Sequence, residues 1–184
     1  HTAGYQITGN VSYGGNTMVG HAAGYAATGA DRSTGLGASA LYYADGAKYN
    51  TAVGRVAGAY AKGTGSTHVG DSSGYRISGN YNTSIGYKAL SGASSGTGYG
   101  TAQLNVAIGY SAMEDSTDAA ENVAVGSYAA GDLTTGDYNT VLGYSALRVG
   151  TTASRNTAIG YAAMHEFIQG DTRNTAVGMY AMHR

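Results

Sequence analysis

The sequence predicts an all-β protein, and within that class a β-solenoid (parallel β-roll) of about ten coils with about 17 residues each. Three observations lead to this prediction. A five-residue motif, Asn-Thr-x-(Val/Ile/Leu)-Gly, recurs along the chain of 184 residues. Glycine is frequent, with 31 copies, whereas the apolar i, i+3, i+4 stripes of amphipathic helices are missing. Leu, Ile, Val and Phe together make up only about 14% of the residues, too few for an ordinary globular core.

The glycine that closes each copy of the motif marks one coil, and we call it the anchor glycine. The anchor glycines are Gly20, Gly37, Gly54, Gly70, Gly86, Gly109, Gly126, Gly143, Gly160 and Gly178. They are 16 to 18 residues apart, except for one interval of 23 residues. We therefore predict a single repeat domain over 1–184, with a partial coil at 1–15, repeats at 16–90, an insertion at 91–104 and repeats at 105–184.

Each copy of the motif predicts a short strand that ends at the anchor glycine. Thr three residues before the glycine, an aliphatic residue directly before it and Ala three residues after it are separated by even steps, so they share one face of an extended chain. We predict that this face is buried. The predicted core residues are Val19, Leu36, Val53, Val69, Ile85, Ile108, Val125, Leu142, Ile159 and Val177. The anchor glycine, on the opposite face, permits a sharp bend or a close backbone approach.

The first position of the motif is Asn in eight copies and Ser in two, at Ser33 and Ser66. Asn suits a turn, and Asn side chains stacked in successive coils can form a hydrogen-bonded ladder. The remaining residues of each coil are variable and polar, which predicts a turn or loop, with or without a second short strand. The absence of proline fits a backbone whose N–H groups bond to neighbouring coils.

One aliphatic residue per coil makes a small core. Its burial offsets only part of the conformational entropy that is lost when a coil is ordered. Backbone pairing between coils and packed tyrosines offset a further part. We therefore expect a second source of burial, either a homotrimer or end-to-end stacking of chains.

Tyrosine, with 17 copies, is the most suggestive residue. Tyr87, Tyr110, Tyr144 and Tyr161 directly follow an anchor glycine, which predicts a ladder of rings along the rod. Such a ladder can stiffen the solenoid by stacking between coils. It can also bind a surface carbohydrate or protein, because each ring offers a flat face and a hydroxyl group.

The composition argues against several classes of function. A net charge of −1 gives no electrostatic reason to bind nucleic acid or anionic membranes. The absence of cysteine removes disulfides and thiolate chemistry. The longest apolar stretches span only a few residues, so we expect no membrane insertion. The chain starts at His1 without a leader region, which predicts a processed product or a fragment.

The residues also indicate neither an enzyme nor a cofactor site. Of the five histidines, only His165 and His183 share a position one coil apart, which is not a metal-ligand set. The acidic residues of one segment predict a solvated loop rather than a calcium site, because the known calcium motifs are missing; they are Glu114, Asp115, Asp118 and Glu121, with Asp132 one period later. No phosphate-binding loop or catalytic triad is recognisable.

Two segments, Asn139–Leu147 and Asn156–Met164, resemble repeats of bacteriophage tail fibres and of the heads of trimeric autotransporter adhesins. This resemblance implies a left-handed parallel β-roll, three chains side by side, and a role in attachment to surfaces. We therefore predict a non-enzymatic structural fibre protein, extracellular on a cell surface or a virion. Its expected partners are further copies of itself and a carbohydrate or protein receptor.

Two alternatives remain open. The chain can be the subunit of an extracellular filament that assembles by head-to-tail stacking of solenoid ends. It can also be a solenoid that binds ice or carbohydrate. The regular series Thr17, Thr34 and Thr51 is predicted to face inward, which argues against ice binding.

Overall fold

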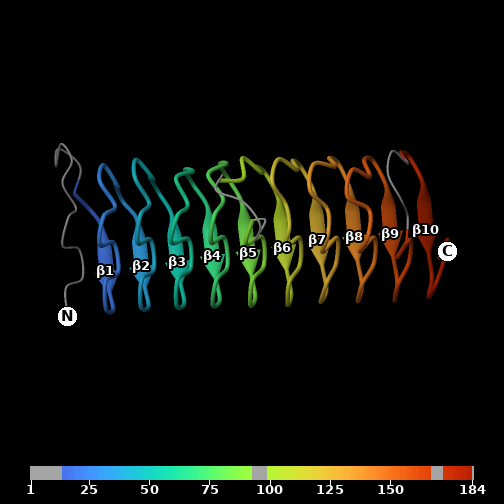
Figure 1. Ribbon diagram of the computed structural model, residues 1–184, viewed down its shortest axis with the longest axis horizontal. Coiled ribbons are helices and arrows are strands. Elements are labelled where there is room, and N and C mark those ends of the chain that lie inside the picture. The colour runs from blue at the N-terminus through green and yellow to red at the C-terminus, as the bar shows by residue number, and fades with distance from the viewer. Residues whose placement is uncertain (1–13, 93–98, 167–171, 184) are drawn as a thin grey trace.

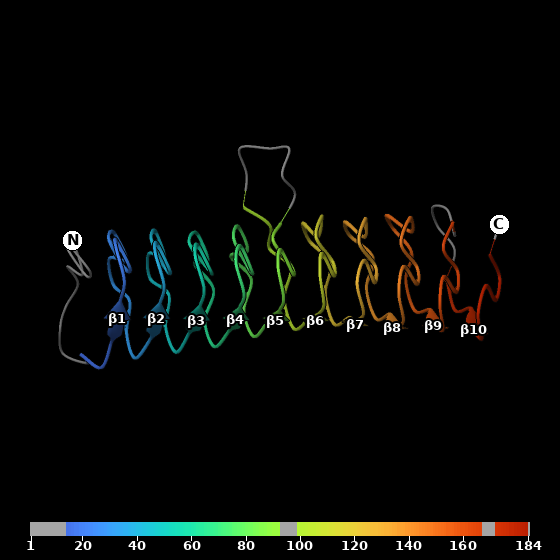
Figure 2. The ribbon, with the colours of Figure 1, turned by 90° about the horizontal axis from the view of Figure 1, so that it is seen from below.

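A computed structural model describes residues 14–92, 99–166 and 172–183 and confirms an all-β solenoid. Ten parallel strands form one sheet in chain order, and the coils stack along the long axis of a rod (Figure 1). The strands are β1 (Thr17–Val19), β2 (Thr34–Leu36), β3 (Thr51–Val53), β4 (Thr67–Val69), β5 (Thr83–Ile85), β6 (Val106–Ile108), β7 (Val123–Val125), β8 (Thr140–Leu142), β9 (Thr157–Ile159) and β10 (Thr175–Val177). Seen from below, all strands lie along one side of the rod (Figure 2). The described residues include no helix that could span a membrane.

The strands pair in one register in spite of their unequal spacing in sequence. Thr17 lies opposite Thr34, and Thr83 lies opposite Val106 across the longest interval. A bridge between Ile77 and Gly100 shows where the coil pattern resumes after the insertion. Residues 93–98 of the insertion predicted at 91–104, and most of the partial coil predicted at 1–15, lie outside the described residues.

A buried asparagine ladder fixes this register, as the motif predicted. The backbone N–H of Asn156 donates to Oδ1 of Asn139 at 2.9 Å, and the same bond recurs one coil later from Asn174 to Asn156 at 3.0 Å. Where Ser33 replaces Asn, its Oγ accepts the N–H of Asn50 at 3.2 Å. The ladder satisfies polar groups that the narrow interior would otherwise leave unpaired.

The anchor glycines stack on one another. At Gly20 the φ angle is +130°, and a Cβ atom there would lie 2.5 Å from the carbonyl oxygen of Gly37. Both the backbone angle and the close approach exclude any other residue without rearrangement. The same contact repeats between successive anchor glycines, which explains why this position never varies.

The chain leaves each anchor glycine in a conformation that alternates between right- and left-handed residues. Ser39 and Leu41, two and four residues after Gly37, have φ angles of 57° and 50°. Their N–H groups bond to the two neighbouring coils. That of Ser39 donates to the carbonyl of His21 in the preceding coil at 2.8 Å, and that of Leu41 donates to the carbonyl of Ala57 in the following coil at 3.0 Å. Bonds between coils thus continue here without a second strand, and outside β1–β10 the described residues form only isolated bridges.

The core is narrow, and two positions in each coil share it. These are the middle residue of the strand and the residue six positions later. In several coils a large side chain at one of these positions faces a small residue at the other, whereas in the coil of β8 both Val141 and Leu147 are large and buried. Met18 packs where Gly24 has no side chain, with its Sδ 3.0 Å from the place of a Cβ. The converse pair is Gly35 and Leu41, where Leu41 is fully buried.

The prediction that the aliphatic residue before the anchor glycine forms the core was wrong. Val19, Leu36, Ile85, Leu142 and Val177 are 39–67% exposed. The others, Val53, Val69, Ile108, Val125 and Ile159, are only partly buried. The alternation of faces does not pass through the anchor glycine, because its positive φ turns the chain. The predicted alanines, such as Ala40 and Ala146, are indeed buried, but the strand residues on either side of the middle one point outward.

Candidate functional site

The outer face of the sheet carries two parallel rows of side chains. One row consists of the aliphatic residues that were predicted to be core. The other consists of the first strand residues, which are Thr in eight of the ten strands and Val in β6 and β7. Thr17 and Thr51 are exposed and Thr34 is half-buried, so the prediction that this series faces inward was also wrong. Because these threonines face outward, their orientation does not exclude ice binding.

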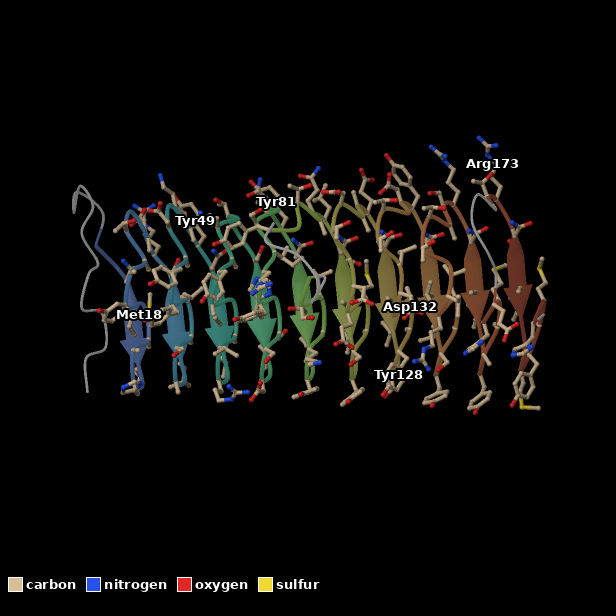
Figure 3. All side chains as sticks on the ribbon, viewed as in Figure 1. Met18, Tyr49, Tyr81, Tyr128, Asp132 and Arg173 are labelled. Atoms are coloured by element: carbon tan, nitrogen blue, oxygen red, sulfur yellow. The ribbon has the colours of Figure 1, made fainter. Side chains whose placement is uncertain are left out.

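A tyrosine ladder runs along one edge of this face. The rings of Tyr87 and Tyr110 stack with centroids 5.3 Å apart, and those of Tyr144 and Tyr161 with centroids 5.1 Å apart. Tyr128 joins the two pairs through edge contacts, and its label in Figure 3 lies beyond the carboxyl end of the strands. A side-chain hydrogen bond with Tyr110 raises the pKa of Tyr128.

The structure thus brings all four predicted ladder residues into line, and it adds Tyr128 and Tyr180. The ring of Tyr180 makes an edge contact with that of Tyr161, with the ring centroids 5.4 Å apart. Both added residues stand two positions after their anchor glycine instead of one, so a search at fixed spacing misses them. In these two coils the residue directly after the anchor glycine is not tyrosine, and a search that allowed one further position would have found Tyr128 and Tyr180.

A second set of tyrosines lies at the opposite end of the strands. Tyr49, Tyr81 and Tyr138 each precede the motif directly, and Figure 3 shows Tyr49 and Tyr81 beyond the amino ends of the strands. Arg32 Nη1 donates a hydrogen bond to the hydroxyl of Tyr49 at 2.9 Å. Arg155 lies 5.2 Å from the ring centroid of Tyr138. Tyrosine–arginine pairs between coils therefore cover this edge.

The histidines form no metal site in the described residues, where no group of three or more candidate ligands occurs. His165 and His183 stack with ring centroids 5.4 Å apart, as expected for residues one coil apart. His68 is instead a core residue: it is the middle residue of β4 and is fully buried against Gly74. Its Nδ1 lies 2.7 Å from Oγ of Ser84, and burial lowers its pKa to about 4.

The acidic segment is held by ordinary contacts. Glu114 pairs with Lys88 at 2.9 Å, and Asp118 accepts a hydrogen bond from Thr101 at 2.6 Å. Burial raises the pKa of Asp115, and the charges of Glu114 and Asp132 raise it further. These partners fit a surface loop that is tied to its neighbouring coils.

Comparison of the chain with protein-family models, curated proteins and solved structures finds no match.

Proposed function

We propose that this chain is the rod of a homotrimeric attachment fibre, extracellular on a cell surface or a virion. The observation that carries the proposal is the continuous aliphatic row on the outer face of the sheet. Monomeric soluble proteins rarely expose a contiguous apolar surface of this kind, and a larger one marks an interaction site. Packing the rows of several copies together would bury them and supply the second source of burial that a thin solenoid needs.

The shape of the row favours association around an axis. The aliphatic stripe is a single residue wide. The first strand residues, mostly threonines, lie on one side, and from Tyr87 onward the tyrosine ladder lies beyond the anchor glycines on the other. Narrow stripes from several rods can converge on a common axis, whereas a two-fold pair of flat sheets would leave much of each stripe beside polar residues. The number three rests on the resemblance of the repeats to fibre and adhesin heads.

Light scattering coupled to gel filtration tests the proposal. The expected mass is three times that of the 18.5 kDa chain. Leu142→Lys places a charge in the stripe and is expected to yield monomers, because a buried unpaired ammonium is costly. Leu104→Lys is the matched control, since Leu104 is as exposed as Leu142, at 48%, but lies outside the stripe. A wild-type monomer, or a Leu142→Lys trimer, would contradict the proposal.

Electron microscopy of the same sample tests the head-to-tail alternative. Discrete rods of one length are expected for the attachment fibre. Long unbranched filaments that grow with concentration would instead support the stacking of solenoid ends, because open sheet edges can pair with one another.

Ice binding is a second candidate, favoured by the outward threonine row. Eight threonines stand in register on a sheet whose strands are about 4.8 Å apart, which gives a regular array of hydroxyl and methyl groups. This function needs the face that a trimer would cover. An ice-recrystallisation assay on the purified protein therefore distinguishes ice binding from trimer formation. Inhibition of recrystallisation by a monomer supports ice binding. A trimer that does not inhibit recrystallisation excludes ice binding.

A further inference from the structure

A groove of about 380 Å³ lies on the connecting segments of the first coils, away from the tyrosine ladder. Its lining comes from three successive connections and from the end of the insertion. Its polar and aromatic lining residues are Thr28, Tyr43, Asp45, Tyr60, Lys62 and Tyr99. Neither the aliphatic row nor the threonine row takes part in it, so the groove is separate from the surface proposed for assembly.

Two rows of equivalent positions build the floor of the groove. Tyr43 and Tyr60 stand six residues after their anchor glycines, and their rings stack with centroids 5.4 Å apart and an interplanar angle of 22°. Two residues further along the chain, Asp45 and Lys62 form the second row. Thr28 extends this row by one coil and donates a hydrogen bond from its hydroxyl to the Asp45 carboxylate.

The aromatic row stops at Tyr43. The equivalent residue of the preceding coil is Ala26, whose small side chain leaves space in line with the stack. Tyr43 remains 42% exposed beside this space. A pyranose ring is close to a tyrosine ring in size and has flat C–H faces, so it can take the place of the missing aromatic ring.

Tyr99 closes the other end of the groove. It follows β5 in the sequence, yet its ring lies 6.1 Å from that of Tyr60, which precedes β4. Lys62 Nζ stands 4.8 Å from the centroid of the Tyr99 ring and is thereby held at the rim. The one interruption of the repeat period thus brings a tyrosine back over an earlier coil.

The polar groups of the groove suit a neutral, hydroxyl-rich ligand. Asp45 offers hydrogen-bond acceptors and Lys62 offers donors, as the two sides of a sugar hydroxyl require. Their charges balance, so the groove has no net attraction for an anion or a cation. We propose that this groove binds a neutral pyranose oligosaccharide that lies along the rod axis. The inference rests on the attachment role proposed above and names the class of ligand.

Saturation-transfer NMR and titration of tyrosine fluorescence on the full chain test this inference. The probes are maltotriose, cellotriose and mannotriose at millimolar concentration, with trigalacturonate as the anionic comparison. At least one neutral trisaccharide is expected to bind more tightly than trigalacturonate. Tyr43→Ala and Tyr99→Ala are each expected to weaken that binding about tenfold, because each removes a stacking surface.

Two further variants make the result specific. Tyr99→Phe keeps the ring and is expected to retain most of the affinity. Tyr138→Ala removes a tyrosine of similar exposure, 49% against 42%, that lies outside both the groove and the ladder, and it is expected to leave affinity unchanged. Circular dichroism checks the fold of each variant. If Tyr43→Ala does not fold, Tyr99→Ala decides, because Tyr99 lies outside the repeat rows.

Three results would overturn the inference: no binding of any neutral trisaccharide, preferential binding of trigalacturonate, or binding that survives Tyr99→Ala unchanged. The mass of each sample, measured by light scattering, tests the fibre proposal separately from sugar binding. A trimer that binds no sugar overturns the groove assignment alone. A monomer that binds sugar through Tyr43 and Tyr99 overturns the fibre and leaves the groove.

Discussion

Oδ1 of Asn122 accepts two hydrogen bonds from Asn139, one from its backbone N–H at 2.8 Å and one from its side-chain Nδ2 at 2.9 Å. Both residues are buried. Asn122 in turn donates from Nδ2 to the carbonyl oxygen of Gly136 at 2.9 Å. One amide thus ties together two coils and the turn between them, and loss of it leaves several buried groups without partners.

The asparagine ladder gives the first prediction. Asn122→Ala is expected to lower the free energy of unfolding by about 3 kcal/mol, because it leaves the N–H of Asn139 and the carbonyl of Gly136 unpaired. Asn122→Ser is expected to cost about half as much, since Ser33 shows that a hydroxyl can accept the N–H of the next coil. Guanidinium unfolding followed by circular dichroism measures both. Equal losses for the two variants would show that the ladder acts through packing alone.

The stacked glycines give the second prediction. Gly126→Ala is expected to destabilise the fold by about 4 kcal/mol or more, because the new Cβ would lie 2.5 Å from the Gly143 carbonyl oxygen at a φ of +135°. Gly131→Ala is the control in the same coil, where the nearest atom lies at 3.4 Å. Its effect is expected to stay within about 1 kcal/mol. The same unfolding measurement applies, and a mild effect of Gly126→Ala would refute the account of the anchor position.

The buried His68 makes stability depend on pH. Its pKa is about 4 in the folded protein and about 6.5 in the unfolded chain, so the unfolded state binds the proton more readily below pH 6.5. Stability is therefore unaffected by this group above pH 6.5 and falls by about 3 kcal/mol as the pH drops from 6.5 to 4.

His68→Met tests this without emptying the core, because Met18 already occupies the equivalent position against Gly24. Urea unfolding at a series of pH values compares the variant with the wild type. The difference in stability between the two is expected to widen in favour of Met as the pH falls from 6.5 to 4. If the difference stays constant over this range, burial does not lower the pKa of His68, and the account is wrong.

The left-handed residue before the motif gives the fourth prediction. Glu121 is exposed and has a φ of 57°, which costs a side-chain-bearing residue about 1 kcal/mol. Glu121→Gly is expected to recover roughly that amount, whereas Ala120→Gly, at the neighbouring residue without a positive φ, is expected to lose roughly 0.5–1 kcal/mol. Thermal unfolding of the two variants should move in opposite directions, and a shift in the same direction would contradict the account.

Much of the fold followed from the sequence because each coil repeats the same local requirements. The spacing of the anchor glycines predicted the number of coils, and the start of the motif predicted the ladder from Asn105 to Asn174. The four ladder tyrosines also followed, since a constant offset from the glycine places side chains in line along the rod. Tyr128 and Tyr180 did not, because they reach the same line from a different offset.

The sequence by itself determined the period, the register and the rows, because these depend only on which residue recurs at which spacing. Only the tertiary structure decided which rows face outward. The positive φ at Gly20 and its equivalents breaks the alternation of faces, so that Val19 and Leu142 point outward whereas the alanines three residues after the anchor glycines, such as Ala40 and Ala146, are buried. The return of Tyr99 to Tyr60 was equally invisible in the sequence, because no repeat spacing relates a residue of the insertion to an earlier coil.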